Sequence, residues 1–236
     1  MVASKIVILT GAGISAESGL GTFRDNGGLW DRHRIEDVAT PEAFARDPDL
    51  VHSFYNTRRA QAAQAEPNPA HFALAWLQAD WPGEVVIVTQ NVDWLHEKAG
   101  GTAIHMHGEL SRALCANCGH RSPAPLVMTP ADPCRACGAR ATRPDIVWFG
   151  EIPYRMEEIA DHLHSCDLFV AIGTSGQVYP AAGFVTEAAY AGARTLEINM
   201  TDSETSAAFD DHRVGLASQT VPAWVTAQLD GVRQLL

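Results

Sequence analysis

The chain has few basic residues and no long hydrophobic run. Lysine and arginine number 17 against 28 aspartates and glutamates, so the 236-residue chain carries a formal net charge of −11. Because contacts to phosphate need Lys and Arg, this balance disfavours nucleic acid as the main partner. No apolar run approaches the length of a membrane span, and Met1 to Ser4 lead into an apolar segment without a cationic signal region. We expect a cytoplasmic protein that does not bind membranes.

Cysteine is also scarce, and its spacing points to a metal. The chain has five cysteines, an odd number that does not suit a secreted disulfide framework. Four of them form the pattern C-x2-C-x15-C-x2-C, and the fifth, Cys166, is expected to be a buried and inert thiol. Four thiolates complete the tetrahedral coordination of zinc and leave no position open for catalysis. We predict one structural Zn²⁺ per chain, bound by Cys115, Cys118, Cys134 and Cys137.

Two alternatives to a structural zinc site stay open at this point. The two pairs could be redox-active, because C-x-x-C is also a thiol–disulfide motif. The segment could instead be a DNA-binding ribbon, since residues 112–143 hold five arginines against one aspartate. That segment has no aromatic residue to stack on a base, which disfavours the second alternative.

Short apolar runs without alternation predict an α/β fold. Such runs suit strands that are buried on both faces of a parallel sheet. They occupy residues 6–9, 85–88, 168–172 and 196–198. Helix-start signals alternate with them at Thr40-Pro41, Asp47-Pro48 and Asn68-Pro69, and Pro180 to Ala191 reads as a helix that Gly192 ends. This alternation predicts a doubly wound, Rossmann-like parallel sheet.

Two stretches depart from the strand–helix alternation. Residues 32–67 read as helices with no strand between them, and residues 112–143 combine four cysteines with four prolines. We predict that these two insertions form a smaller domain, made of a helical part and a zinc ribbon. The Rossmann-like domain then comprises residues 1–31, 68–111 and 144–236.

A glycine-rich segment follows the first predicted strand. Gly11 to Ala16 fits G-x-G-x-x-G/A, in which small residues and a following helix let the backbone approach a pyrophosphate. A dehydrogenase would also need an acidic residue at the end of a second strand about twenty residues later, and none is present. We therefore expect a dinucleotide that is used for something other than hydride transfer.

Polar and small residues end three further predicted strands. They are Gln90 to Asp93, Gly173 to Gly176, and Asn199. Ligands of doubly wound sheets bind at this edge. His105 and His107 follow nearby, and either imidazole titrates close enough to neutrality to act as a base. The residues alone do not choose between the two histidines.

Together these motifs resemble those of the sirtuin family, in the same order, from Lys5 to about Val225. The matching motifs are Gly11-Ala12-Gly13-Ile14-Ser15, Thr22-Phe23-Arg24, Thr89-Gln90-Asn91-Val92-Asp93 with Leu95-His96, His107-Gly108, the four paired cysteines, Val147-Trp148-Phe149-Gly150-Glu151 and Gly173-Thr174-Ser175. Tyr55 and Arg58 look like the Y-x-x-R of class III members, and the short chain resembles bacterial ones.

The resemblance implies an enzyme of the transferase class, an NAD-dependent protein-lysine deacylase. Such an enzyme removes acetyl groups, and in class III also succinyl and malonyl groups, and yields nicotinamide, 2′-O-acyl-ADP-ribose and free lysine. It implies that His107, the histidine before a glycine, is the catalytic base. NAD would be the co-substrate and acylated proteins the partners; a monomer is compatible with the sequence.

The resemblance also implies which residues bind the two substrates. The NAD-binding residues would be Gly11, Ala12, Gly13, Ile14, Ser15, Ala16, Glu17, Thr22, Phe23, Arg24, Trp30, Gln90, Asn91, Val92, Asp93, Gly173, Thr174, Ser175, Asn199, Met200 and Ala217. Val147, Trp148 and Phe149 would pair with the substrate backbone as an added strand. Tyr55 and Arg58, on one face of a helix, would grip an acyl carboxylate; the alternative is an ordinary amphipathic helix.

Two other functions stay open at the level of sequence. One is a regulatory protein that senses NAD and carries a zinc ribbon, and the other is a protein ADP-ribosyltransferase. Release of nicotinamide that depends on an acylated peptide favours the deacylase over the sensor, and labelled NAD would mark the acceptor of an ADP-ribosyltransferase.

Overall fold

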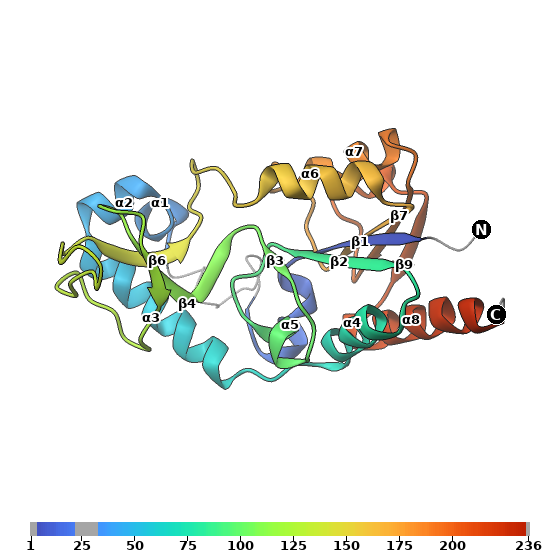
Figure 1. The fold of residues 1–236 in the computed structure, drawn as a ribbon, viewed down its shortest axis with the longest axis horizontal. Helices are drawn as coiled ribbons and strands as arrows, with labels where there is room; N and C mark the ends of the chain where they lie inside the picture. Colours follow the sequence, from blue (N-terminus) through green and yellow to red (C-terminus); the bar gives the residue numbers. More distant parts are fainter. Residues whose placement is uncertain (1–3, 22–32, 235–236) are drawn as a thin grey trace.

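The computed structural model describes residues 4–21 and 33–234. Within these residues the largest sheet consists of β1 (Lys5–Thr10), β2 (Glu84–Thr89), β3 (Ile104–His105), β7 (Leu168–Ile172), β8 (Arg194–Asn199) and β9 (Asp211–Val214). The strands lie in the order β3-β2-β1-β7-β8-β9, and every neighbouring pair is parallel (Figure 1). The predicted doubly wound α/β sheet is confirmed.

The central strands are buried on both faces, which explains their unalternating sequences. Ile6 and Ile8 of β1 belong to one hydrophobic cluster, and Val7 and Leu9 belong to the other. Successive side chains of a strand point to opposite faces, so both faces of β1 need apolar residues.

Helices cover the two faces of this sheet. The four main ones are α4 (Pro69–Asp80), α6 (Met156–Ser165), α7 (Phe184–Tyr190) and α8 (Ala217–Arg233). Figure 1 shows α4 and α8 below the sheet and α6 and α7 above it, and the two clusters divide in the same way. Shorter pieces are α5 (Leu95–Lys98) and the 3₁₀ turns η4 (Ala181–Gly183) and η5 (Ser206–Ala208). Among the described residues, no helix is both long and apolar enough to cross a bilayer.

The predicted helix starts are confirmed by their capping bonds. Thr40 accepts a hydrogen bond from the N–H of Ala43 at the start of α2 (Pro41–Arg46). Asp47 caps α3 (Pro48–Gln64) in the same way, and Asn68 caps α4. In each case proline follows the cap, where its missing N–H leaves no bond unmade.

The segment after β1 differs from the expectation of a helix. Gly11 is followed by two 3₁₀ turns, η1 (Ala12–Ile14) and η2 (Ala16–Ser18). Gly19 ends the second turn with φ = 83°, a left-handed conformation that glycine adopts without steric cost. The segment expected to bind a pyrophosphate at the N-terminus of a helix consists of tight turns instead.

A smaller layered module lies to one side of the sheet, at the left of Figure 1. It contains α1 (Ile35–Val38), α2, α3 and an antiparallel sheet in the order β5 (Arg121–Pro123), β4 (Gly108–Cys115), β6 (Thr142–Ile146). Its own cluster includes Val38, Phe54 and Trp148. Because β4 begins at Gly108 and β6 ends at Ile146, the small sheet extends beyond residues 112–143 on both sides. The division into two domains at the predicted boundaries stays a prediction.

Candidate functional site

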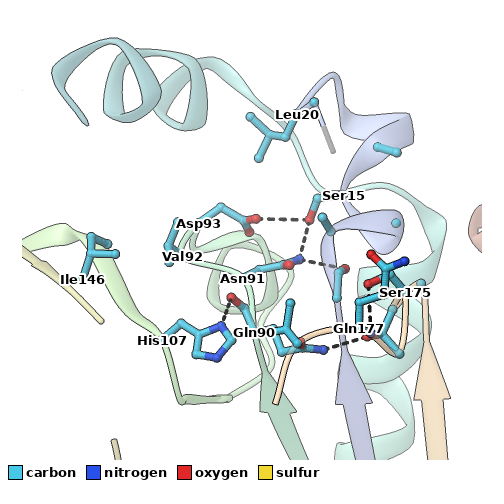
Figure 2. A pocket seen from close by; sticks show the side chains of 18 of the residues that line it. Ser15, Leu20, Gln90, Asn91, Val92, Asp93, His107, Ile146, Ser175 and Gln177 are labelled. Carbon is cyan, nitrogen blue, oxygen red and sulfur yellow. Dashed lines mark hydrogen bonds between the residues drawn. The ribbon is translucent and has the colours of Figure 1, made fainter. Parts of the chain in front are cut away.

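A cavity of about 780 Å³ lies between the large sheet and the small module. The loops that follow β1, β2 and β7 line it, together with the end of β8. In the view of Figure 2, Val92 and His107 lie between Ile146 of the small sheet and the side chains of Ser15 and Ser175. The carboxyl edge of the sheet therefore forms the floor of the cavity, where ligands of doubly wound folds bind.

Most of the predicted site residues line this cavity. Those that do are Gly11, Ala12, Gly13, Ser15, Ala16, Tyr55, Arg58, Gln90, Asn91, Val92, Asp93, His107, Val147, Trp148, Phe149, Gly173, Thr174, Ser175, Asn199, Met200 and Ala217. Ile14 is fully buried outside the lining, and the Glu17 carboxylate accepts hydrogen bonds from Ser218. The predicted residues Thr22, Phe23, Arg24 and Trp30 lie outside the described part of the chain.

The glycines after β1 are required by a contact between two loops. A Cβ atom on Gly11 or on Gly13 would lie 2.7 Å from backbone atoms of Gly173. The N–H of Gly13 donates to the carbonyl oxygen of Gly173 at 2.8 Å. Any larger residue separates these loops, so the glycine pattern has a packing role here besides leaving room for a ligand.

A buried hydrogen-bond network fixes the polar side chains at the floor of the cavity. The hydroxyl of Ser15 donates to Asp93 at 3.2 Å and accepts from the amide of Asn91 at 3.1 Å (Figure 2). Nδ1 of His71 accepts from the backbone N–H of Asn68, so Nε2 carries the proton and points it at Ser15, 3.5 Å away. Burial lowers the pKa of His71 to about 4, which keeps this imidazole neutral.

The carboxyl group of Asp93 is buried beside the cavity and is held by hydrogen bonds. Its exposed fraction is 7%. Burial raises its pKa, and the hydrogen bonds from the N–H of Leu95 and from Ser15 counteract this rise. A carboxyl group held by two donors inside a cavity has a defined orientation toward a ligand.

The two candidate histidines occupy different environments. Nδ1 of His107 faces the carbonyl oxygen of Gln90 at 3.1 Å, so Nδ1 carries the proton and Nε2 keeps its lone pair. Burial lowers the pKa of His107, which favours this neutral form. Of the two histidines, only His107 lines the cavity.

His105 is held in an ion pair. Its Nε2 lies 3.1 Å from the carboxylate of Glu97, and its Nδ1 lies 3.2 Å from the carbonyl oxygen of Asn91. Burial alone lowers the pKa of His105, but the hydrogen bond and charge of Glu97 raise it above its ordinary value. With an acceptor at each nitrogen, His105 holds its protons and has no free lone pair.

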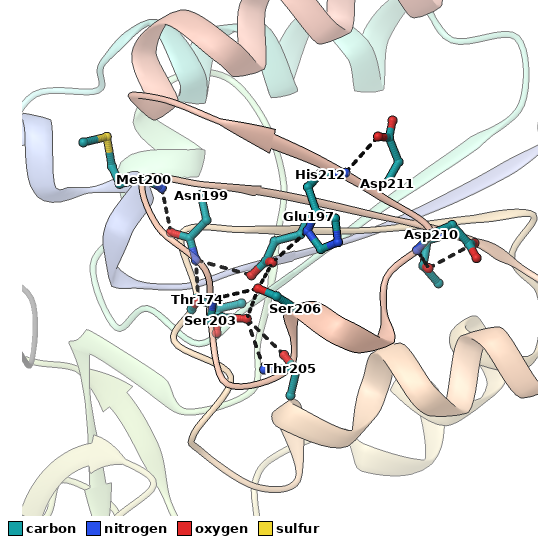
Figure 3. A network of polar contacts seen from close by, with 11 residues as sticks. Thr174, Glu197, Asn199, Met200, Ser203, Thr205, Ser206, Asp210, Asp211 and His212 are labelled. Atoms are coloured by element: carbon teal, nitrogen blue, oxygen red, sulfur yellow. Dashed lines mark hydrogen bonds and ion pairs between the residues drawn. The ribbon is translucent and has the colours of Figure 1, made fainter.

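The other end of the floor is fixed by a network around Glu197, shown in Figure 3. The side-chain amide of Asn199 donates to the carbonyl oxygen of Thr174 at 2.8 Å. Behind it, the buried carboxylate of Glu197 accepts a hydrogen bond from Ser206 and lies 3.3 Å from Nδ1 of His212. This network holds the loop after β8 against the loop after β7.

The four paired cysteines fit one zinc ion. Their sulfur atoms all lie within 4.8 Å of one another. The Sγ atoms of Cys115 and Cys137 are 3.7 Å apart, and those of Cys118 and Cys134 are 3.8 Å apart. A tetrahedron with Zn–S bonds of about 2.3 Å has edges of about 3.8 Å. Four sulfur ligands at these spacings match a structural zinc site, in which all four coordination positions are taken by the protein.

Zinc removal is expected to unfold the small module. Binding free energy at a closed thiolate site is folding free energy, so chelation should lower the melting temperature, and activity should fall as the cavity loses one wall. Metal analysis should give one zinc per chain before chelation. An unchanged melting temperature after complete chelation would contradict a structural role.

Two cysteine variants serve as controls for the zinc content. Cys166→Ser should keep one zinc per chain, whereas Cys134→Ser should lower the zinc content.

Several lining residues were not identified from the sequence. Gln177 and Tyr179 follow the Gly173–Gly176 segment and line the cavity. Their position just after a predicted strand end could have identified them, because ligands bind at this edge of the sheet. Leu110, Ile146 and Ala62 come from the small module and line the cavity with apolar side chains. No sequence signal marks these three, because only the packing of the module on the sheet brings them to the site.

Comparisons with known proteins agree with one another. A family profile described as the Sir2 family matches residues 11–180. A protein from Bdellovibrio bacteriovorus named NAD-dependent protein deacylase is 56% identical over 230 residues, 96% of this chain and 97% of its own length. A protein of the same name from Escherichia coli is 52% identical, over 97% of this chain and 84% of its own.

Solved structures show the same likeness. A Sir2 homologue in complex with NAD aligns with a TM-score of 0.90 at 35% identity, over 98% of this chain and 91% of that one. A mutant Sir2 homologue in complex with ADP-ribose aligns with a TM-score of 0.91 at 34% identity, over 98% and 94% of the two chains.

Proposed function

The chain belongs to the Sir2 family and is an NAD-dependent protein deacylase, and we propose that its cavity accepts lysine side chains bearing succinyl or malonyl groups as well as acetyl. The observation that carries this proposal is the presence of Tyr55 and Arg58 in the same cavity as His107 and the glycine loop. A guanidinium group binds a carboxylate through two parallel N–H donors, and a phenol adds a third. An acetyl group offers no carboxylate to such a pair.

The charge of Arg58 is partly balanced within the site. Burial lowers the pKa of Arg58, while the neighbouring Tyr55 and the carboxylate of Asp93 raise it. The guanidinium group stays charged, because arginine does not lose its proton in proteins. The guanidinium group of Arg58 is partly buried and lines the cavity, so it favours an anionic substrate group over a neutral one.

We assign NAD to the floor of the cavity. The turns from Gly11 to Ser15 would accommodate its pyrophosphate, and Ser175 and Asn199 its adenosine ribose. Asn91 and Asp93, oriented by Ser15, would hold the nicotinamide amide and ribose. When bound, NAD supplies a glycosidic bond whose cleavage releases nicotinamide and activates the ribose toward the acyl oxygen.

His107 is proposed as the general base. Its Nε2 lone pair is available because Gln90 holds the proton on Nδ1. In this role His107 would take a proton from a ribose hydroxyl of the bound co-substrate. It would then pass that proton to the lysine amine that is released, which restores the neutral imidazole.

The segment from Val147 to Phe149 is proposed to contact the substrate backbone. Its three N–H groups already donate within the chain, to His107, Glu151 and Ala39. An added strand that leaves these bonds intact must therefore pair through carbonyl oxygens of the segment, which accept hydrogen bonds from substrate N–H groups.

The test of the proposed function is a set of peptides that differ only in the group on one lysine. Purified protein, NAD and the unmodified, acetyl, malonyl or succinyl peptide are incubated, and nicotinamide release and kcat/KM are measured for each. We expect release with every acylated peptide and none with the unmodified one, and a higher kcat/KM for the acidic groups. Turnover of the acetyl peptide alone would remove the acidic substrates from the proposal.

The same assay separates the two alternative functions. Saturable NAD binding without turnover on any acylated peptide would indicate a sensor. Label that passes from NAD to protein without deacylation would indicate an ADP-ribosyltransferase. Cytoplasmic location, the monomeric state and the lack of a nucleic-acid partner stay predictions.

A further inference from the structure

Trp148 is held on three sides although its ring is not part of the chemistry. Its exposed fraction is 2%. The guanidinium carbon of Arg143 lies 3.5 Å from the centre of its ring, and the carboxylate of Glu151 accepts from its backbone N–H at 2.8 Å. Its indole Nε1–H donates to the hydroxyl oxygen of Tyr55 at 3.0 Å. These contacts fix the indole ring in one orientation. Arg143 comes from β6, and Glu151 comes from the turn that follows it.

Arg143 is itself fixed, which makes the position of the indole definite. Its two terminal nitrogens donate to Glu151 at 2.6 and 2.8 Å. One of them also donates to the carbonyl oxygen of Ile146 at 2.6 Å. A guanidinium group with three such bonds, stacked on an indole ring, keeps that ring from rotating.

The contact between Trp148 and Tyr55 sets the direction of the phenolic proton. An indole N–H can only donate, so the oxygen of Tyr55 accepts in this bond and its own proton must point elsewhere. The hydroxyl proton of Tyr55 lies close to the plane of the phenol ring and can point to either side of the C–O bond. The N–H of Trp148 occupies one of these sides and disfavours the proton there. Burial raises the pKa of Tyr55 to about 12, so the hydroxyl keeps its proton over the working range of pH.

We propose that Trp148 is a positioning residue for acyl selectivity: its indole N–H turns the hydroxyl proton of Tyr55 toward the cavity, where it donates to the carboxylate of an acidic acyl group beside Arg58. This inference rests on the proposed role of Tyr55 and Arg58. Without the indole donor, the hydroxyl of Tyr55 can turn its proton toward position 148 and present a lone pair to the substrate carboxylate. The consequence falls on acidic acyl groups, because an acetyl methyl accepts no hydrogen bond.

The measurement is the ratio of kcat/KM on a succinyl-lysine peptide to kcat/KM on the matched acetyl peptide. Trp148→Phe removes the N–H and keeps an aromatic ring for Arg143. We expect the ratio to fall about three- to tenfold, the size of one neutral hydrogen bond, mainly through a higher KM for the succinyl peptide. A matched control is Trp76→Phe, which removes an indole N–H that donates to Asp80 on α4 and should leave the ratio unchanged.

A second substitution covers the case in which phenylalanine disturbs the packing. Replacing Trp148 by 3-benzothienylalanine exchanges the N–H for sulfur in a ring of nearly the same shape, and it should lower the ratio by the same factor. In a Tyr55→Phe background, Trp148→Phe should cause no further fall, because the effect passes through the hydroxyl. A further fall of the same size in that background would overturn the proposal.

The outcomes separate this inference from the function on which it rests. If Arg58→Met lowers the ratio and both changes at Trp148 leave it unchanged, the carboxylate clamp stands and the positioning role of Trp148 is wrong. If the unaltered enzyme does not act on the succinyl peptide, the clamp and the positioning role are both wrong. Equal losses on the two peptides would reduce Trp148 to a structural residue.

Discussion

Replacing His107 by alanine is expected to lower kcat on every acylated peptide by roughly 10²–10⁴-fold, the usual contribution of a general base. The variant should keep its fold, because the His107 side chain makes a hydrogen bond to the carbonyl oxygen of Gln90 and lines the cavity, and it belongs to none of the three hydrophobic clusters. The measurement is single-turnover nicotinamide release with matched thermal melting curves. An unchanged rate would remove His107 from its proposed role.

The pH profile tests the same assignment without a mutation. A base works in its neutral form, so activity that depends on His107 is present above its pKa and lost as the pH falls through it. Burial lowers this pKa from the ordinary value of 6.5, so the acidic limb of kcat/KM should lie below pH 6.5. A limb above that value would point to a histidine with a raised pKa, such as His105.

His105→Gln is the matched control for the histidine assignment. It removes an imidazole two residues away that is bound between Glu97 and the carbonyl oxygen of Asn91. Because this ring does not line the cavity, its loss should cost far less activity than the loss of His107. Equal losses of activity in the two variants would contradict the assignment of His107, rather than His105, as the base.

Replacing Arg58 by methionine is expected to impair succinyl and malonyl substrates selectively. Removing the partner of a desolvated carboxylate costs about 2–5 kcal/mol, which corresponds to roughly 30- to 4,000-fold in kcat/KM. The acetyl peptide makes no such pair and should lose at most a few-fold. The measurement is kcat/KM on the matched peptides, and equal losses on all of them would make Arg58 an ordinary structural residue of α3.

The neighbouring arginine offers a control for the charge effect. Arg59 is buried, and its guanidinium donates to the carbonyl oxygen of Leu110 at 2.6 Å and to Asn56 at 2.9 Å. Arg59→Met removes both of these bonds, and the Asn56 oxygen keeps only the donor from the N–H of Met128. The variant should therefore have a lower melting temperature and reduced activity on all peptides alike. The two adjacent substitutions thus distinguish loss of selectivity from loss of stability.

Much of the fold is predictable from the sequence because its signals are local. Apolar runs such as Ile6 to Leu9 identify central strands, and side-chain caps such as Asn68 identify helix starts within a residue. Short edge strands carry no such signal: β3 has two residues, and β9 has only one partly buried position. Their pairing comes from neighbouring strands and not from their own composition.

For the α4 helix, the sequence predicts the residue at which the helix begins but does not predict which of its faces is buried. The helix begins at the predicted residue. Phe72 and Trp76 are one turn apart and both lie on its exposed side, with exposed fractions of 52% and 38%. The residues that pack against the sheet are instead Leu74 and Leu77. Helical spacing identifies residues that share a face, and only the position of the sheet decides which face is buried.

The four clustered cysteines, the central strands and the glycine-rich segment can be identified from the sequence, because each depends on residue type at short spacing. The packing of distant elements sets which histidine lines the cavity, the contact of His105 with Glu97, and the contact of Tyr55 with Trp148. These contacts join residues from separate elements, and Tyr55 and Trp148 are 93 positions apart. Their geometry exists only once the small module packs on the sheet, since no local rule specifies a distance between distant parts of a chain.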